Sequence, residues 1–309
     1  GEHTLIPLDI DVSPFDNSGT KKEGVALTYK GTFGFAPIFS YLGNEGYGVN
    51  LQLREGSTHS QKDGADYLRE SIHYARRITS NRLLVRMDSA HDSMENLQVC
   101  HAEKEVDYII KVNLRGTPKE SWLQIAEEKG MKCEQRPGKT EYIGFIAFPQ
   151  KGFESNLRQV FQVIVRSIDR EGQILLFPEI EVNVFWTSLT CSPRRVIELY
   201  RDHATSEQFH SELKTDLDLE RLPAGKFDTN ELILHAGVFA YNLLRIMGQE
   251  SLREDDAPIR GGVKRRRIRT VIQNIVYIAA RVSRHARKTT FNFGRYSPWF
   301  QTVRRIYQA

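Results

Sequence analysis

The sequence predicts a mixed α/β fold in which helices pack on a central mixed sheet. Three observations support this prediction. Strand and helix patterns alternate over residues 1–113, extended segments rich in Phe, Val and Ile follow over residues 114–189, and a long helical pattern begins at Ser192. Alternation of strands and helices is typical of a sheet whose faces are covered by helices.

The first part of the chain contains five strand patterns, each an apolar or β-branched run bounded by turn residues. They are residues 5–13, 32–42, 47–54, 82–88 and 107–113. The second and third strands form a predicted hairpin around the turn at residues 43–46. Helices are expected at residues 62–78 and after Asp92, which separate the later strands. Together these patterns predict a five-stranded mixed sheet.

The rest of the chain divides into a β-rich part and a helical part. Extended segments are predicted at residues 142–148, 159–167, 173–177 and 181–188, with a polar loop at 130–139. Ser192 and Pro193 suit the start of a helix that runs to about residue 214, and further helices are expected at residues 229–247 and 263–288. The predicted division of the chain is a first core part (1–113), a β-rich insertion (114–190), a second core part (191–250) and a basic helical region (251–309).

Composition excludes several classes of protein. A hydrophobic content of 40% and a charged content of 27% are ordinary for a globular protein. The chain contains neither an apolar run long enough to cross a bilayer nor a signal-peptide pattern, so we expect a cytoplasmic protein without a membrane partner. The 3 cysteines are far apart and form no C-x-x-C pair, which predicts neither disulfides nor a structural zinc site.

Positive charge is concentrated at the end of the chain. Residues 257–309 contain 13 Lys or Arg and no Asp or Glu, although the whole chain has a net charge of only +4. Such a segment attracts a polyanion through phosphate contacts and counterion release. A solvated helical face is the alternative, but the absence of any acidic residue favours contact with nucleic acid, with Lys264, Arg265 and Arg269 among the expected contacts.

Two strands carry carboxylates whose burial would be unfavourable without a partner. Asp9 and Asp11 lie two residues apart, so both point to one face of the first strand, and Asp88 ends the fourth strand. If these strands are neighbours, Asp11 and Asp88 approach to about 5 Å, and a divalent cation is the usual remedy for the repulsion between them. Asp9 remains an alternative ligand to Asp11, and His91 could approach the same site.

Tyr200, Glu207 and Lys214 recur every seven residues on one predicted helix, and His203 lies close to the same stripe. Such a stripe is often only the solvated side of a helix, but with the strand aspartates it suggests a site for metal-dependent phosphoryl transfer. The other acidic residues of interest are expected to have structural or surface positions. Asp16 and Asp92 are expected to be loop or cap residues, and Glu198 and Glu212 are expected on a solvated surface.

These residues resemble the signature of the DDE transposases of bacterial insertion sequences. The resemblance rests on Asp11 within IDVS, Asp88 within VRMDS, and the frame from Tyr200 to Glu207 followed by Lys214, which is similar to the subgroup pattern Tyr-x₂-Arg-x₃-Glu-x₆-Lys. The chain departs from this pattern at one position, because His203 stands where the subgroup has Arg.

The resemblance implies a ribonuclease H-like fold with a β-rich insertion before the last catalytic helix. It implies that Asp11, Asp88 and Glu207 bind two Mg²⁺ ions, which Mn²⁺ could replace, and that Tyr200, His203 and Lys214 contact DNA. It further implies hydrolysis at transposon ends, strand transfer into target DNA, and a homodimer assembled on DNA. A ribonuclease H-like nuclease without strand transfer and a non-catalytic DNA-binding protein derived from a transposase remain alternatives.

Overall fold

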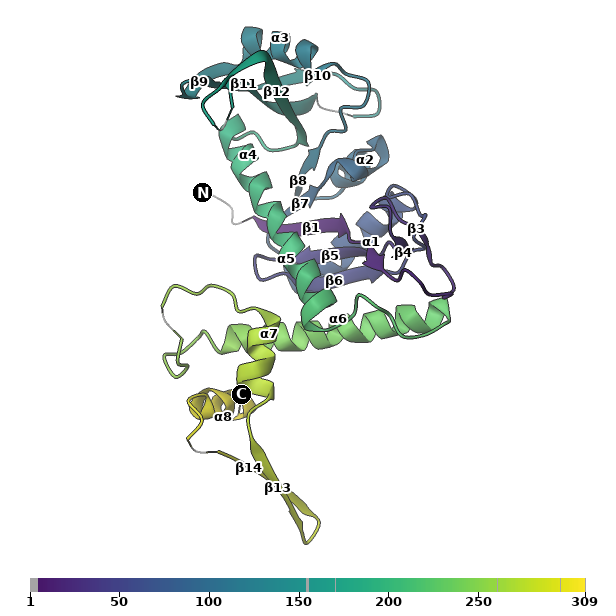
Figure 1. Ribbon diagram of the computed structural model, residues 1–309, viewed down its shortest axis with the longest axis vertical. Coiled ribbons are helices and arrows are strands. Elements are labelled where there is room, and N and C mark those ends of the chain that lie inside the picture. Colours follow the sequence, from purple (N-terminus) through teal and green to yellow (C-terminus); the bar gives the residue numbers. More distant parts are fainter. Residues whose placement is uncertain (1–4, 154–155, 170, 260, 295, 309) are drawn as a thin grey trace. The chain divides into compact units, whose positions relative to one another are not determined.

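The structure is a computed structural model that describes residues 5–153, 156–169, 171–259, 261–294 and 296–308 (Figure 1). The chain divides into two compact units. Unit 1 consists of Gly1–Val12, Ile38–Asn44 and Thr58–Ser206, and unit 2 consists of Ser13–Pro37, Glu45–Ser57 and Glu207–Ala309. Each unit therefore contains segments that are distant in sequence.

Unit 1 is built around a mixed sheet with the strand order β5-β1-β7-β8-β12-β11-β10-β9. Its strands are β1 (Ile6–Val12), β5 (Ile38–Leu42), β7 (Leu83–Met87), β8 (Val106–Lys111), β9 (Met131–Arg136), β10 (Lys139–Phe148), β11 (Leu157–Ile168) and β12 (Ile174–Thr187). β1 is antiparallel to β5 and parallel to β7, which is parallel to β8. The remaining neighbours, from β8 to β9, are antiparallel. The prediction of a mixed sheet flanked by helices, consistent with a ribonuclease H-like fold, is thus confirmed. The predicted number of five strands is wrong, because β12, β11, β10 and β9 continue the same sheet beyond β8.

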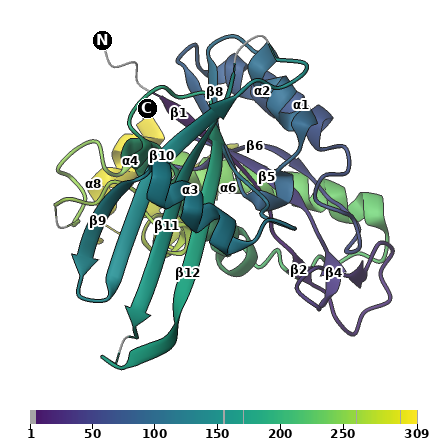
Figure 2. The ribbon, with the colours of Figure 1, turned by 90° about the horizontal axis from the view of Figure 1, so that it is seen from above.

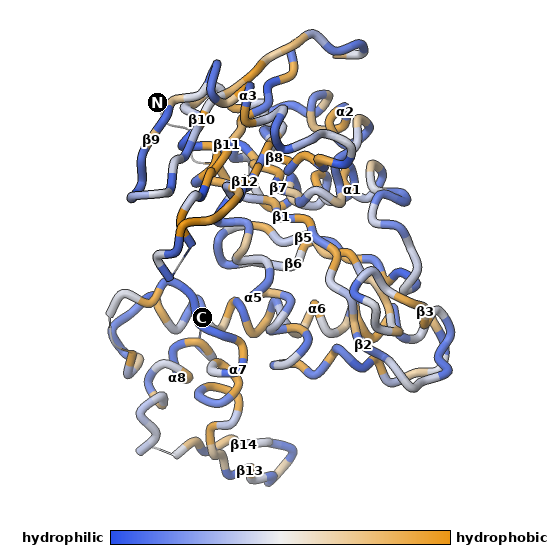
Figure 3. The backbone as a smooth tube through the Cα atoms, turned by 45° about the horizontal axis from the view of Figure 1, so that its top comes forward, coloured by the Kyte–Doolittle hydropathy of each residue, from blue (hydrophilic) through white to orange (hydrophobic). Residues whose placement is uncertain are grey.

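The central strands are hydrophobic because both of their faces are covered. All five residues of β7 are buried, and Figure 3 shows hydrophobic residues along β7 and β8. Helices α1 (Gly64–Ile78) and α2 (Met94–Ala102) lie close to each other beside these strands (Figure 2). The buried stripe of α1 includes Leu68, Ile72 and Ala75, spaced as the sequence predicts.

The strands after β8 extend the same sheet. β12 pairs with β8 through Phe185–Thr187 and then continues beyond it, pairing with β11 along most of its length. A helix absent from the sequence prediction, α3 (Lys119–Lys129), packs Trp122 and Ala126 against Phe161 and Val184 (Figure 2).

Three sequence expectations for this region need correction. The predicted loop at 130–139 contains strand β9, which pairs with β10, so pairing outweighs the low strand propensity of its charged residues. The two segments 173–177 and 181–188 form one strand, β12, because Pro178 is tolerated within it. The segment 32–42 is instead divided at Pro37 into β4 (Phe33–Phe35) and β5.

Unit 2 combines a small sheet with a long helix. β2 (Phe15–Asp16), β4 and β3 (Ala26–Leu27) form a sheet in the order β2-β4-β3, and β6 (Tyr47–Gln52) also belongs to this unit. The helix α6 (Phe227–Glu250) matches the prediction for 229–247 and buries Leu234, Val238 and Tyr241. Asn242 in α6 binds the backbone N–H and C=O of Gly48 in β6.

The predicted helix at 263–288 is wrong over most of its length. Only α7 (Ile268–Val271) and the π-helix η4 (Ile272–Val276) are helical, and they are followed by the antiparallel strands β13 (Ala280–His285) and β14 (Lys288–Phe293) and by helix α8 (Phe300–Gln308). The β-branched and aromatic residues of Thr289-Thr290-Phe291 favour a strand, and pairing with Val282 outweighs the helical spacing of the arginines. No helix among the described residues is long and apolar enough to cross a membrane.

Candidate functional site

The aspartates at the ends of β1 and β7 lie side by side because these strands are parallel neighbours. Ile10 pairs with Met87 in the register, and Asp11 and Asp88 each come one position later. The carboxyl ends of the two strands therefore present their acids at the same edge of the sheet. The expectation that the first and fourth predicted strands are adjacent is confirmed.

His91 completes a group of three possible metal ligands in unit 1. One ligand atom from each of Asp11, Asp88 and His91 lies within 4.8 Å of the others. A short 3₁₀ helix, η1 (Ser89–His91), produces this arrangement: the Asp88 carboxylate accepts a hydrogen bond from the N–H of Ala90 at 3.0 Å, which turns the chain back. Two carboxylates and an imidazole are donors that suit a divalent cation.

Asp9 has a different role from Asp11 although both lie on the same face of β1. Its carboxylate accepts hydrogen bonds from Nε and Nη2 of Arg86, each at 2.7 Å, and lies 2.8 Å from Nδ1 of His203. Burial raises the pKa of Asp9, but the hydrogen bond and charge of His203 and the charge of Arg86 outweigh burial and lower it. Asp9 is a buried ion-pair partner, so among the described residues Asp11 is the carboxylate of β1 that joins the candidate metal group.

Arg86 links the sheet to the helix that follows β12. This arginine pairs with Asp9 in the register of β7 and β1, and its Nη1 donates to the backbone carbonyl of Leu199 at 2.7 Å. Leu199 lies in α4 (Pro193–Arg201). Arg86 is not among the predicted site residues, but an arginine within the apolar run LLVRM needs a carboxylate partner when it is buried, so the sequence does carry a signal for this ion pair.

Tyr200 and His203 lie in unit 1 beside the metal group. The ring of Tyr200 packs on Phe185 with centroids 4.6 Å apart, and it also contacts His203. Burial and the charges of Asp88 and Asp11 raise the pKa of Tyr200. Burial lowers the pKa of His203, but the hydrogen bond and charge of Asp9 outweigh burial and raise it. His203 is buried against Asp9, and its predicted contact with DNA stays a prediction.

The helix that carries Tyr200, Glu207 and Lys214 is not a regular α-helix. After α4 come the 3₁₀ helix η2 (Asp202–Thr205), helix α5 (Ser206–Ser211) and the π-helix η3 (Glu212–Asp216). Changes of helix type shift the direction of side chains, so the regular helical geometry behind the predicted seven-residue stripe is interrupted, and the stripe itself stays a prediction. Glu207 is exposed and belongs to unit 2, and its approach to Asp11 and Asp88 stays a prediction.

Within unit 2, Lys214 contacts the segment that follows β1. Its Nζ donates to the carbonyl of Pro14 at 2.5 Å and lies 5.4 Å from the ring centroid of Phe15. A lysine that is half-buried in this way presents its charge at a fixed place. Its predicted contact with a DNA phosphate is untested and remains a prediction.

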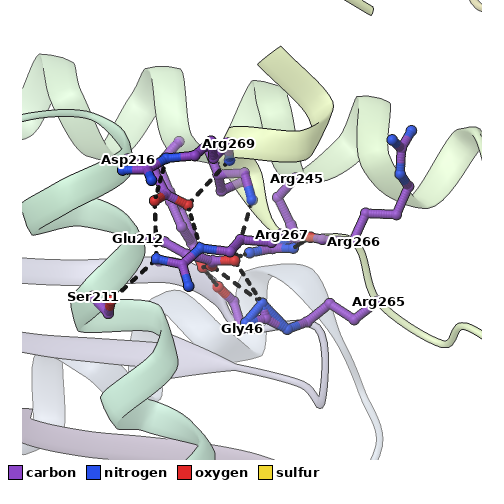
Figure 4. Close-up of polar contacts among 12 residues, drawn as sticks. Gly46, Ser211, Glu212, Asp216, Arg245, Arg265, Arg266, Arg267 and Arg269 are labelled. Atoms are coloured by element: carbon purple, nitrogen blue, oxygen red, sulfur yellow. Dashed lines mark hydrogen bonds and ion pairs between the residues drawn. The ribbon is translucent and has the colours of Figure 1, made fainter. Parts of the chain in front are cut away.

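The prediction of a solvated Glu212 is wrong, because this side chain is buried at the centre of an ion-pair network (Figure 4). Its carboxylate accepts hydrogen bonds from Arg245, from Nη1 of Arg265 at 3.0 and 3.1 Å, and from the N–H of Ile268 at 3.2 Å. Burial raises the pKa of Glu212, and the two guanidinium groups oppose that effect without cancelling it. Helical periodicity could not reveal this network, since its arginines come from α6 and from the segment before α7.

A second acid of η3 holds the same basic segment. Asp216 accepts hydrogen bonds from Nε of Arg267 at 2.9 Å and from the N–H of Arg269 at 3.1 Å (Figure 4). Two of the predicted DNA contacts, Arg265 and Arg269, are thus paired with internal acids, while Lys264 is exposed. The network borders a pocket of about 400 Å³ lined by Glu207, Gln208, Ser211, Glu212, Arg265 and Arg267.

Comparison with known proteins gives one family match over the whole chain. The family model described as "Transposase DDE domain group 1" matches residues 2–309. A search of curated protein sequences gives no match. Among solved structures, the chain is similar to a piggyBac transposase in a synaptic complex with hairpin DNA, with a TM-score of 0.41 and 8% identity. That match covers 78% of this chain and 46% of the piggyBac chain, so the present chain spans about half the length of that protein.

Proposed function

Since the chain belongs to the family of transposase DDE domains of group 1, we propose that it is a DNA transposase. Its reaction is metal-dependent phosphoryl transfer, in which transposon ends are hydrolysed and a 3′-OH is joined to target DNA. The observation that carries the proposal is the group formed by Asp11, Asp88 and His91 at the carboxyl edge of β1 and β7. The proposal includes a cytoplasmic location.

The residues of the candidate site have separate roles in this proposal. Asp11 and Asp88 hold Mg²⁺ or Mn²⁺, and Glu207 supplies the third catalytic carboxylate. A divalent cation, when bound, supplies positive charge that activates the attacking oxygen and stabilises the leaving oxygen at phosphorus. Two such ions suit the in-line displacement of phosphoryl transfer. His91 contributes a neutral nitrogen donor to the same group.

Other side chains position the DNA rather than react with it. Lys214, Lys264 and Arg269 supply positive charge for phosphates, and Tyr200 borders the metal group through its contact with His203. The internal contacts of His203 and Arg265 favour positioning roles for these two side chains: His203 holds Asp9, and Arg265 holds Glu212. A homodimer assembled on DNA is part of the proposal because transposition joins two ends of one element.

The test is a reaction of the chain with plasmid DNA in Mg²⁺, in Mn²⁺ and in EDTA. The proposal expects nicking or cleavage with either cation and none with EDTA. Joining of a labelled 3′-OH oligonucleotide to the plasmid separates a transposase from a simple nuclease. DNA binding without any metal-dependent cleavage would instead favour a non-catalytic DNA-binding protein.

A further inference from the structure

The strands β13 and β14 form a two-stranded ribbon within unit 2, shown at the yellow end of the chain in Figure 1. Six residue pairs join them, from Ala280–Phe293 to His285–Lys288. The turn consists of Ala286 and Arg287, which both have positive φ (47° and 64°), as hairpin turns of type I′ require. Every residue of β13 is exposed, and so are the first five of β14.

The pairing register gives the ribbon two different faces. Directly opposed residues of antiparallel strands share a face, and alternate residues of one strand do too. One face therefore carries only hydrogen-bonding side chains: Arg281, Ser283, His285, Lys288, Thr290 and Asn292. The other face carries Val282 opposite Phe291, a cross-strand apolar pair that stabilises the ribbon.

The positive charge of the ribbon is complementary to the negative charge of a polyanion. Residues 280–293 include four Lys or Arg and no Asp or Glu. A face made only of polar side chains has little apolar area to offer a protein partner. An isolated ribbon is also marginally stable in water, so a ligand that covers this face would stabilise it.

The dimensions of the ribbon match duplex DNA. The major groove is wide enough to admit a two-stranded β-ribbon. Same-face residues on one strand are about 6.8 Å apart, which is about two base-pair steps of 3.4 Å. Arg281 and Asn292 are directly opposed on the polar face. Arg forms bidentate hydrogen bonds with guanine and Asn with adenine, so this pair can read neighbouring bases.

We propose that the polar face of β13–β14 enters the major groove of duplex DNA and that Arg281 and Asn292 contact base edges there. The inference rests on the DNA substrate of the proposed function and adds a sequence-reading element to it. Lys264 and Arg269, which the proposed function assigns to phosphates, carry no sequence preference, whereas this ribbon discriminates between sequences.

The chain offers a matched control for this proposal. Arg284 lies on the same strand as Arg281, carries the same charge and is also exposed, but the register places it on the opposite face, across from Thr289. Loss of Arg284 removes one cation without removing a base contact. Loss of Arg281 removes one cation and also one base contact.

The experiment selects bound sequences from a pool of randomised duplex DNA in EDTA, so that cleavage plays no part. The wild-type chain should enrich a motif. Arg281→Ala and Asn292→Ala should each lose the base preference at one position of that motif, with a drop in specificity of about tenfold. Arg284→Ala should keep the motif and weaken binding to all sequences alike. Circular dichroism confirms that each exposed variant is folded.

Other results overturn the proposal. They are a wild-type chain that enriches no motif, and Arg281 and Asn292 variants that retain the wild-type motif and its specificity ratio. Netropsin, which occupies the minor groove, should not displace the chain from a selected duplex, and displacement by netropsin contradicts the groove assignment. If the wild type cleaves DNA but the motif is unchanged in the variants, only this inference fails. If the motif changes but no metal-dependent cleavage occurs, only the proposed catalysis fails.

Discussion

Nδ1 of His203 lies 2.8 Å from Oδ1 of Asp9, although 194 positions of sequence separate these residues. Asp9 also binds Arg86 through two hydrogen bonds, so one buried carboxylate joins β1, β7 and the 3₁₀ helix η2. These contacts occupy Asp9 and leave Asp11 for the metal group.

The His203–Asp9 contact predicts a pH-dependent stability. The folded state raises the pKa of His203 above its ordinary value of 6.5. The interaction of protonated His203 with Asp9 therefore stabilises the fold fully at pH values below 6.5, and this stabilisation is lost as the pH rises through the pKa of the folded state. We therefore expect the midpoint of urea unfolding to fall as the pH increases from 6.5 upward. His203→Asn should flatten this dependence. An equal slope in the variant would show that another group is responsible.

Asp9 predicts a second change at acid pH. Its pKa is below the ordinary value of 3.8, so its contribution is complete above 3.8 and is lost as the pH falls through the folded value. Asp9→Asn should lower the free energy of unfolding most at pH values above 4. In strong acid the variant and the wild type should have the most similar free energies of unfolding. Unfolding curves of both proteins across this range measure the difference.

Metal affinity should depend on His91 as well as on the carboxylates. Imidazole suits Mn²⁺ better than Mg²⁺, so the chain should bind Mn²⁺ more tightly, and His91→Asn should reduce this preference by about tenfold. Asp88→Asn should weaken the binding of both Mg²⁺ and Mn²⁺. Electron paramagnetic resonance of free Mn²⁺ measures binding directly. Asp16→Asn, at a carboxylate that caps Ser18 and lies outside the group of possible metal ligands, is the control and should bind both ions like the wild type.

Glu207→Gln should abolish cleavage and leave DNA binding nearly unchanged, because it removes a carboxylate but keeps the shape and helix propensity of the side chain. Glu198→Gln is a matched control, since Glu198 lies exposed on the same helical run and only pairs with Arg195. Parallel cleavage and anisotropy measurements decide the result. Equal loss of binding and cleavage in the Glu207 variant would point to a structural glutamate.

Glu212→Ala should destabilise the fold by about 3–5 kcal/mol, because it leaves the buried guanidinium of Arg245 without its carboxylate. The control Glu198→Ala breaks an exposed pair and should change stability by less than about 1 kcal/mol. Denaturant unfolding of the two variants gives the comparison. Similar values for both would mean that the network contributes little.

The two adjacent strand-end aspartates, Asp11 and Asp88, could be predicted from the sequence because their signals are local. Apolar runs that end in an aspartate identified β1 and β7, and the spacing of Tyr200, Glu207 and Lys214 carried the family resemblance. The family match over residues 2–309 agrees with that resemblance. The ends of these strands can be predicted from the length and hydrophobic pattern of short segments, and both are properties of the local sequence.

Some residues have the same local sequence pattern but different roles, and only the tertiary structure distinguishes those roles. Asp9 and Asp11 have the same strand periodicity, and the register that places Arg86 beside Asp9 separates an ion-pair partner from a candidate metal ligand. Glu212 has the pattern of a surface residue, but the burial of Arg245 requires a carboxylate beside it. The cations of β13 fit helical spacing as well, and pairing with β14 determined that they lie on a ribbon, because strands gain their hydrogen bonds from distant partners.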